Sequence, residues 1–245
     1  IQTLNAPEGD RFAVLFTFAN GQKLHNYSKE IHFLIGELMA RLHKVTINQT
    51  LNRVNYTPEI LLVDSLNKMT RFLSSDSEEM NFMKSTQKYL LNEFSKIKTK
   101  ETRQGIVHLD IWFDNLNITK ENIVTFFDFD FCGNGMLCLD LAFYILQVNS
   151  IERDENECKL KVNSFLEGYN SITKIPDEEI RIIPMLGVSL YFFYLGIQCE
   201  RFDNWSNSFL NESYLKRFIN GLVKRYFDLN KLGGKNFTHS TTHKS

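Results

Sequence analysis

Hydrophobic residues in the first half of the chain recur at helical spacing in two segments. From Ser28 onward they recur every three or four residues, which predicts an amphipathic helix that closes near His43 and Lys44. A similar stripe over residues 83–97 predicts a second helix. The stripe of the first helix consists of Ile31, Leu34, Ile35, Leu38, Met39 and Leu42.

Short runs of β-branched and aromatic residues predict strands in two places. Residues 12–18 (FAVLFTF) end at the turn sequence Ala-Asn-Gly, which predicts a buried strand followed by a turn. Residues 106–109, 116–119 and 123–127 are similar runs with polar residues between the last two. We therefore expect one strand near the start and a small β region in the middle of the chain.

The second half of the chain is predicted to be helical. Helical patterns cover residues 139–148, 155–168, 177–201 and 214–227. The apolar stretch 182–199 is short for a membrane span and contains Pro184, Ser189 and Gln198, so we interpret it as a buried core helix. The order of elements predicts an α+β fold with a mainly helical lobe, a small β insert and one strand of a second lobe.

Charge and cysteine content exclude some partners without naming one. The 28 Lys and Arg residues nearly balance 29 Asp and Glu residues, and no basic block is present. We therefore expect no nucleic-acid and no membrane partner. The four cysteines are scattered, and we interpret them as reduced thiols of a cytoplasmic protein. The oligomeric state stays open.

A motif that can carry chemistry follows the first strand of the β region. Residues 108–115 (HLDIWFDN) place Asn115 five positions after Asp110, and Asp128 follows the predicted hairpin. This order resembles the catalytic loop and metal-binding Asp of the kinase superfamily. The resemblance implies that Asp110 is the catalytic base for an acceptor hydroxyl, and that Asn115 and Asp128 bind the Mg²⁺ ion that accompanies ATP.

Two further segments resemble the aminoglycoside phosphotransferase and choline-kinase-like family, which includes homoserine kinases and stress-response kinases. Asp140-Leu141-Ala142 is similar to the D-L-A tripeptide of the helix that supports the catalytic loop. Residues 35–43 (IGELMARLH) resemble the helix that follows the strand between the lobes. The resemblance implies a protein-kinase-like fold in which Asp140 is structural support.

The resemblance also implies a division of the chain. Residues 15–21 correspond to the hinge between lobes, where the backbone of Phe16, Thr17 and Phe18 would meet the adenine of ATP. We expect residues 1–20 to be a truncated remnant of the N-terminal β lobe and hinge, residues 21–230 the C-terminal lobe, and residues 231–245 a flexible tail. The phosphate-binding Lys and the Gly-rich loop of the family precede the hinge. The sequence is therefore expected to be a fragment that binds ATP poorly on its own.

Several positions depart from the family or allow a second interpretation. Leu109 stands where Gly is common, and Trp112-Phe113 replaces a pair that is often His-Pro, which makes the acceptor side more apolar. Asp130 would add a second metal contact. We expect His108 to be a packed scaffold residue. The aromatic cluster 191–194 is interpreted as core packing, with a face for a cationic acceptor as the alternative.

The predicted function is transfer of the γ-phosphate of Mg-ATP to a hydroxyl of a small molecule, namely an amino alcohol, an amino acid or an aminosugar. A nucleotide-binding pseudokinase or scaffold is one alternative, because no phosphate-binding Lys precedes the hinge and Trp112-Phe113 is unusual. A bacterial stress-type protein Ser/Thr kinase is another, because it shares the same motifs.

Overall fold

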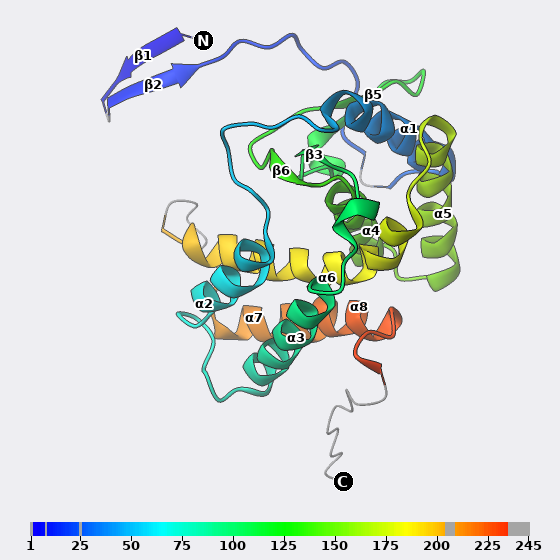
Figure 1. The fold of residues 1–245 in the computed structure, drawn as a ribbon. Coiled ribbons are helices and arrows are strands. Elements are labelled where there is room, and N and C mark those ends of the chain that lie inside the picture. Colours follow the sequence, from blue (N-terminus) through cyan, green and yellow to red (C-terminus); the bar gives the residue numbers. More distant parts are fainter. Residues whose placement is uncertain (1, 8, 25, 204–208, 235–245) are drawn as a thin grey trace.

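The computed structural model describes residues 2–7, 9–24, 26–203 and 209–234, and these residues form a mainly helical protein (Figure 1). The α-helices are α1 (Lys29–Thr46), α2 (Ser65–Met69), α3 (Glu78–Phe94), α4 (Cys138–Ile151), α5 (Glu155–Ile172), α6 (Asp177–Glu200), α7 (Glu212–Phe218) and α8 (Lys224–Leu229). The π-helical segments are η1 (Glu59–Asp64), which leads into α2, and η4 (Ile219–Val223), which joins α7 to α8. Short 3₁₀ turns are η2 (Thr99–Glu101) and η3 (Phe113–Asn115).

Three two-stranded antiparallel sheets complete the fold of the described residues. Their strands are β1 (Gln2–Ala6), β2 (Gly9–Ala13), β3 (Gln104–Val107), β4 (Leu116–Ile118), β5 (Val124–Phe126) and β6 (Gly133–Met136). β1 pairs with β2, β3 with β6, and β4 with β5. The registers of the last two pairs set Ile106 opposite Asn134 and Asn117 opposite Thr125. The predicted α+β class with a small β insert in a helical lobe is confirmed.

The predicted helices form where local sequence signals begin and end them. α1 starts directly after Ser28 and ends just past Lys44, as the hydrophobic stripe predicts. The Ser77 hydroxyl accepts a hydrogen bond from the Met80 amide at the start of α3, and the Asp154 carboxylate accepts two at the start of α5. Such caps satisfy backbone donors that the first helical turn leaves without partners. α1 packs along α5 more extensively than any other pair of elements.

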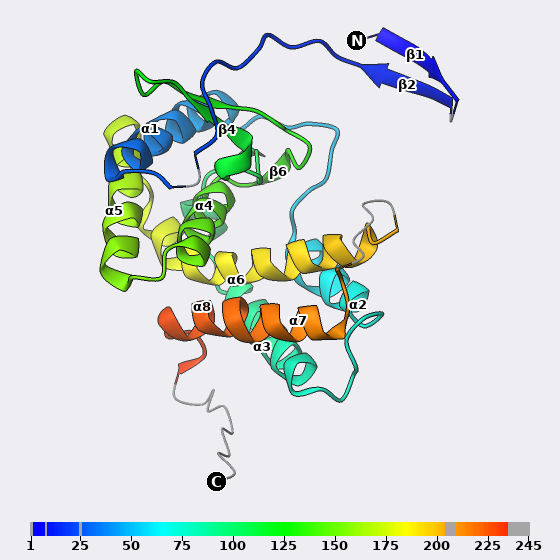
Figure 2. The same cartoon turned by 180° about the vertical axis from the view of Figure 1, so that it is seen from behind.

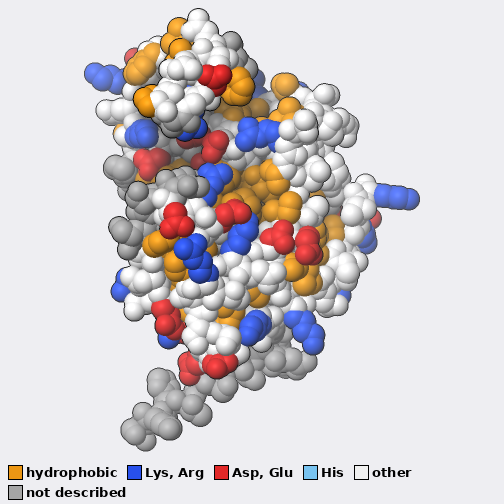
Figure 3. Space-filling model, turned by 90° about the vertical axis from the view of Figure 1, so that its left-hand side faces the viewer, with side chains coloured by type: hydrophobic (Ala, Val, Ile, Leu, Met, Phe, Trp, Pro, Cys, Tyr) orange, Lys and Arg blue, Asp and Glu red, His pale blue; other side chains and the backbone are white. Residues whose placement is uncertain are grey.

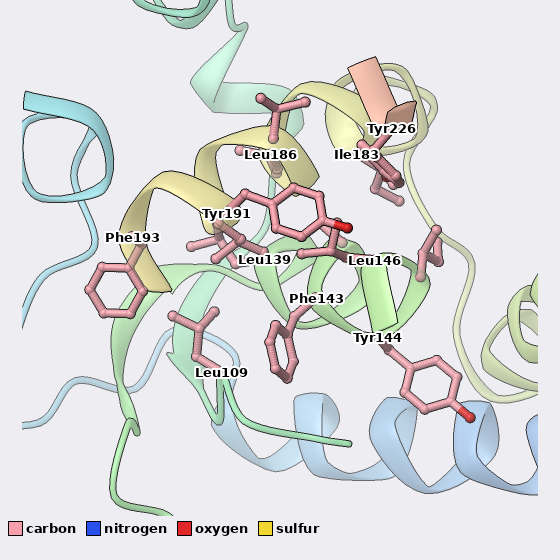
Figure 4. Packing of buried hydrophobic residues seen from close by; sticks show 14 of the residues in the cluster. Leu109, Leu139, Phe143, Tyr144, Leu146, Ile183, Leu186, Tyr191, Phe193 and Tyr226 are labelled. Carbon is pink, nitrogen blue, oxygen red and sulfur yellow. The ribbon is translucent and has the colours of Figure 1, made fainter. Parts of the chain in front are cut away.

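Helix α6 lies at the centre of the core. It contacts α2, η1, α4 and α8, and two opposite views show it crossing the molecule between α4 and the α7–α8 segment (Figure 2). Figure 4 shows Leu146 of α4 beside Tyr191 of α6, where the two helices meet. By length and composition α6 could cross a membrane, but 72% of its apolar window is buried within the protein. The predicted buried core helix is confirmed.

The prediction of a buried strand over residues 12–18 is wrong. β2 ends at Ala13, and within the described chain the β1–β2 hairpin has no further strand neighbour. Phe16 and Phe18 are 80% and 84% exposed, and the hairpin stands apart from the helical body (Figure 1). Hydrophobic strands are buried only where another layer covers them. No described residue covers this segment.

The end of the chain is only partly described. Leu232 packs against the hydrophobic core, and residues 235–245 of the predicted tail lie outside the described residues. On the face of the molecule in Figure 3, charged side chains of both signs are scattered with hydrophobic side chains exposed between them. This distribution matches a formal net charge of −1.

Candidate active site

The catalytic loop predicted at residues 108–115 connects β3 to β4 and is anchored by Asp140 of α4. The Asp140 carboxylate accepts hydrogen bonds from the backbone amides of His108 at 2.9 Å and Leu109 at 2.6 Å. It also meets His43 Nε2 at 3.0 Å, while His43 Nδ1 meets the Tyr169 hydroxyl at 2.7 Å. Asp140 is 1% exposed. Its contacts fit the predicted role of structural support, because a buried carboxylate that accepts several hydrogen bonds fixes the backbone that donates them.

Leu109 has an unusual backbone conformation at the start of this loop. Its φ angle is 58°, in the left-handed region, which costs a residue other than glycine roughly 1–2 kcal/mol. The side chain is fully buried and points toward the packed side chains of α4 and α6 (Figure 4). Its amide donates to Asp140, and its carbonyl accepts a hydrogen bond from the Tyr194 hydroxyl. Burial and these two hydrogen bonds offset the conformational cost.

Asp110 and Asn115 lie in direct contact. The Asn115 Nδ2 group donates to the Asp110 carboxylate at 2.8 Å and to the Asp110 carbonyl at 2.9 Å. Burial raises the pKa of Asp110 to about 7, against the hydrogen bond from Asn115, and the negative charges of Asp128 and Asp130 raise it further. A carboxylate with a pKa near neutrality is suited to accept a proton at physiological pH.

His108 supports this loop as a packed residue. Its Nδ1 atom accepts a hydrogen bond from the Asp110 amide at 3.2 Å, and its ring lies 4.3 Å from the ring of Phe129. Burial lowers the pKa of His108, so the neutral imidazole is favoured. The side chain is 1% exposed, which agrees with the scaffold role expected from the sequence.

Asp128 and Asp130 follow β5 and differ in their surroundings. Asp128 is exposed, and its φ angle of 65° turns the chain sharply after the strand. The Asp130 carboxylate lies 3.5 Å from the Arg201 guanidinium. The backbone carbonyl of Asp130 accepts a hydrogen bond from Arg53. Asp130, which the sequence suggested as a second metal contact, is therefore part of an ion pair.

The side chains at this site fit a hard divalent cation. The described residues contain no cluster of three or more His, Cys, Asp or Glu side chains that could hold a metal ion. The predicted pair, however, combines a carboxylate with an amide oxygen, both of which suit Mg²⁺ when phosphate oxygens complete the shell. Because Nδ2 of Asn115 donates to Asp110, its Oδ1 atom is the donor that a cation would meet.

The predicted adenine-binding residues Phe16, Thr17 and Phe18 are exposed and directly precede a segment that is fixed to β4. The Ala19 carbonyl accepts a hydrogen bond of 2.7 Å from Asn117, and Gln22 pairs with Ile118 through two backbone hydrogen bonds of 3.0 Å. Gly21 makes this approach possible, because a Cβ there would lie 2.5 Å from the Ile118 backbone. The segment that precedes α1 is thus fixed to β4, the strand that follows Asn115.

A small pocket opens beside Trp112 and Phe113, two and three positions after Asp110. It has a cavity volume of ≈ 40 Å³ and a lining that is mostly aromatic or aliphatic. At its polar side Lys161 contacts Glu152 at 2.7 Å and Asn26 at 3.1 Å. Other lining residues are Tyr27, His32, Tyr144, Gln147, Val148 and Ile151.

The sequence drew attention to Trp112 and Phe113 but not to the remaining lining residues, which come from three separate segments without a shared motif. The cluster at residues 191–194, by contrast, belongs to the core. Tyr191, Phe192 and Phe193 are at most 5% exposed, and none of the four residues lines this pocket. The interpretation as core packing is confirmed.

These features define a protein-kinase-like phosphotransferase fold, and comparison with known proteins agrees. Residues 2–170 match the phosphotransferase enzyme family (APH). The chain belongs to this family. Its kinases use ATP with a divalent metal ion.

Three relatives illustrate the similarity. An uncharacterized protein of Synechocystis, sll1119, is 30% identical over 222 residues, which are 89% of this chain and 60% of that protein. The homoserine kinase of Methylobacillus glycogenes is 24% identical over 185 residues, 75% of this chain and 56% of the kinase. The solved structure of a microcompartment-associated aminopropanol kinase superposes with a TM-score of 0.73 at 18% identity, over 94% of this chain and 73% of that one. The chain thus spans about 60% of the length of the curated relatives it matches.

Proposed function

We propose that the protein transfers the γ-phosphate of Mg-ATP to a hydroxyl group of a small molecule. The observation that carries this proposal is the contact between Asp110 and Asn115 in a loop that Asp140 anchors, with Asp128 close enough to raise the pKa of Asp110. A kinase needs an aligned acceptor and neutralised phosphate charge more than covalent help. Asn115 and Asp128 would hold the Mg²⁺ ion, which supplies that neutralisation when it is bound.

Asp110 has the main chemical role among the residues of the chain. Its carboxylate accepts a hydrogen bond from the acceptor hydroxyl and so orients the oxygen toward the γ-phosphorus. That oxygen forms a bond to phosphorus, the bond from phosphorus to the β,γ-bridging oxygen breaks, and the hydroxyl proton passes to Asp110. ADP and the phosphate ester are the products. Asn115 keeps the carboxylate in place through its 2.8 Å hydrogen bond.

The pocket beside Trp112 and Phe113 is the proposed position of the acceptor. Two of its lining residues, Trp112 and Phe113, follow Asp110 closely in the same loop. The pocket combines an apolar wall with the polar groups of Glu152 and Lys161. A cavity of ≈ 40 Å³ suits a short molecule. Of the three acceptor classes, an amino alcohol or hydroxy amino acid fits this size better than an aminosugar. The names of the aminopropanol kinase and homoserine kinase relatives support the same choice.

The proposal includes the remaining expectations for the whole protein. The backbone of Phe16, Thr17 and Phe18 would contact adenine, since these residues precede the segment that is fixed to β4. The balanced charge and scattered cysteines support a cytoplasmic location.

The test is phosphate transfer by the whole protein with Mg-ATP and a panel of short hydroxyl compounds, before and after Asp110→Asn. We expect turnover with an amino alcohol or hydroxy amino acid and a loss of at least about 100-fold in kcat for the variant. Asp114→Asn is the matched control, because Asp114 lies in the same loop and pairs only loosely with Lys23 at 3.8 Å. Full activity in Asp110→Asn, or phosphate transfer only to protein substrates, would refute the proposal.

A further inference from the structure

A tyrosine far along the chain holds the residue that precedes Asp110. Tyr194 lies in α6, and its hydroxyl donates a hydrogen bond to the carbonyl of Leu109, 85 positions earlier. This carbonyl belongs to the peptide that joins Leu109 to Asp110. The contact therefore connects the central core helix directly to the peptide from which the proposed base extends.

The ring of Tyr194 is itself well fixed. It stacks on Phe143 of α4 with centroids 5.1 Å apart and an interplanar angle of 27°, and it lies 5.6 Å from the ring of Phe131. Burial raises the pKa of Tyr194 well above its usual value, and nearby negative charge from Asp110 raises it further. The phenol is thus a neutral donor at every physiological pH.

The hydrogen bond from Tyr194 also stabilises an unfavourable backbone conformation of Leu109. A leucine with a φ of 58° has a tendency to return to a more favourable conformation, which would rotate the following residue. Asp140 holds the amide of Leu109, and Tyr194 holds its carbonyl. The two contacts together define the direction in which the Asp110 side chain leaves the loop.

We propose that Tyr194 is a positioning residue for catalysis, which fixes the Leu109–Asp110 peptide through its hydroxyl and thereby aims the Asp110 carboxylate at the acceptor. The proposal rests on the function proposed above, because it assumes that Asp110 is the base. It goes further by assigning a role to one atom of a residue that otherwise resembles core packing.

Tyr194→Phe removes that atom and keeps the ring. Tyr191→Phe is the matched control, because Tyr191 lies one helical turn earlier and its hydroxyl meets Ser150 at 2.9 Å, away from the loop. Both variants lose one buried hydroxyl from the same helix. A general loss of core stability would therefore affect them alike, whereas a positioning role would affect Tyr194→Phe alone.

The experiment measures two properties of the whole protein. With Mg-ATP and an acceptor that supports turnover, we expect kcat to fall about 10- to 100-fold in Tyr194→Phe while KM for ATP stays within about twofold, since small displacements of a reacting group have effects of this size. Hydrogen–deuterium exchange of residues 106–116 should become faster in Tyr194→Phe and stay unchanged in Tyr191→Phe.

Each outcome decides the matter. Unchanged exchange of residues 106–116 in Tyr194→Phe overturns the proposal whether or not an acceptor is known, so this readout is independent of the proposed function. Faster exchange with unchanged kcat, or an equal fall of kcat in both variants, also overturns it. A loop that loosens in Tyr194→Phe while no hydroxyl compound is phosphorylated by the unchanged protein would place the failure in the proposed function instead.

Discussion

The side-chain amide of Asn115 donates a hydrogen bond of 2.8 Å to the carboxylate of Asp110. This contact favours the charged carboxylate, yet burial opposes it and dominates, so that the pKa of Asp110 is raised to about 7. Asp128 and Asp130 add to the effect. Burial and the neighbouring carboxylates therefore disfavour the charged form of Asp110, and a bound cation would relieve this.

Asp110→Asn should make the protein more stable at high pH. The unfolded carboxyl titrates near 3.8 and the folded one at about 7, so the folded state binds more protons between these values and stability falls as pH rises through them. The shift corresponds to at most about 4 kcal/mol, and since the group is partly exposed we expect a gain of about 1–3 kcal/mol at pH 8. Urea unfolding of both proteins without added metal ions measures this gain in the free energy of unfolding.

The same experiment at low pH provides the control for Asp110→Asn. Well below pH 3.8 the carboxyl is protonated in both states, so the stabilities of the variant and the unchanged protein should converge as the pH falls toward that value. A gain that is equal at pH 4 and pH 8 would show that ionisation of Asp110 is not its origin.

Asp140→Asn should destabilise the protein and displace the loop. An asparagine offers one oxygen where the carboxylate accepts from both the His108 and Leu109 amides, so one buried donor loses its acceptor. The expected loss is roughly 2–3 kcal/mol in the free energy of unfolding. Asp154→Asn is a matched control, because asparagine is an equally good N-cap for α5. Equal unfolding midpoints for the two variants in urea would contradict the anchoring role of Asp140.

The parts of the fold that follow from sequence are those governed by local patterns. The stripe that begins at Ile31 predicts α1 closely, because an amphipathic helix needs only one apolar face and its own caps. The order of Asp110, Asn115, Asp128 and Asp140 resembles the catalytic loop and its support in the kinase superfamily. The structure agrees with that order to the extent that Asp140 holds the loop that carries Asp110 and Asn115.

Elements that depend on distant partners could not be predicted in this way. β6 has the sequence GNGM, which has little strand propensity. It forms because β3 pairs with it and because Gly133 lets Val54 and Tyr56 approach to within 2.7 Å of where a Cβ would be. The contact of Tyr194 with Leu109 has the same character, because no local pattern connects α6 to the loop.

The buried His32 should make stability fall in mild acid. Burial lowers the pKa of His32 from 6.5 to about 4, so below pH 6.5 the unfolded state takes up a proton that the folded state does not. The free energy of unfolding is therefore unaffected by His32 above pH 6.5. As the pH falls from 6.5 to about 4, the free energy of unfolding decreases by about 3 kcal/mol in all. His32→Gln, which can still bond to the Tyr144 hydroxyl that meets His32 Nδ1 at 2.8 Å, should remove this part of the pH dependence. NMR that shows a protonated His32 ring at pH 6 would contradict the prediction.

The close packing of α1 against α5 should depend on glycine at Gly168. A Cβ at this position would lie 1.9 Å from the carbonyl oxygen of Phe33, which belongs to the backbone of α1 and cannot turn away as a flexible side chain would. Gly168→Ala should therefore lower the free energy of unfolding by about 1–3 kcal/mol or more, because the helices must separate.

Gly221→Ala is the comparison that isolates this effect. Gly221 lies in η4, and nothing stands within 4 Å of its added Cβ. Alanine loses less backbone entropy than glycine on folding, so this variant should be unchanged or more stable by roughly 0.5–1 kcal/mol. Thermal and urea unfolding of both variants measure the difference. If Gly168→Ala is as stable as Gly221→Ala, the α1–α5 interface can widen at little cost in free energy. In that case backbone contact with α5 does not fix α1, the helix whose His43 contacts Asp140.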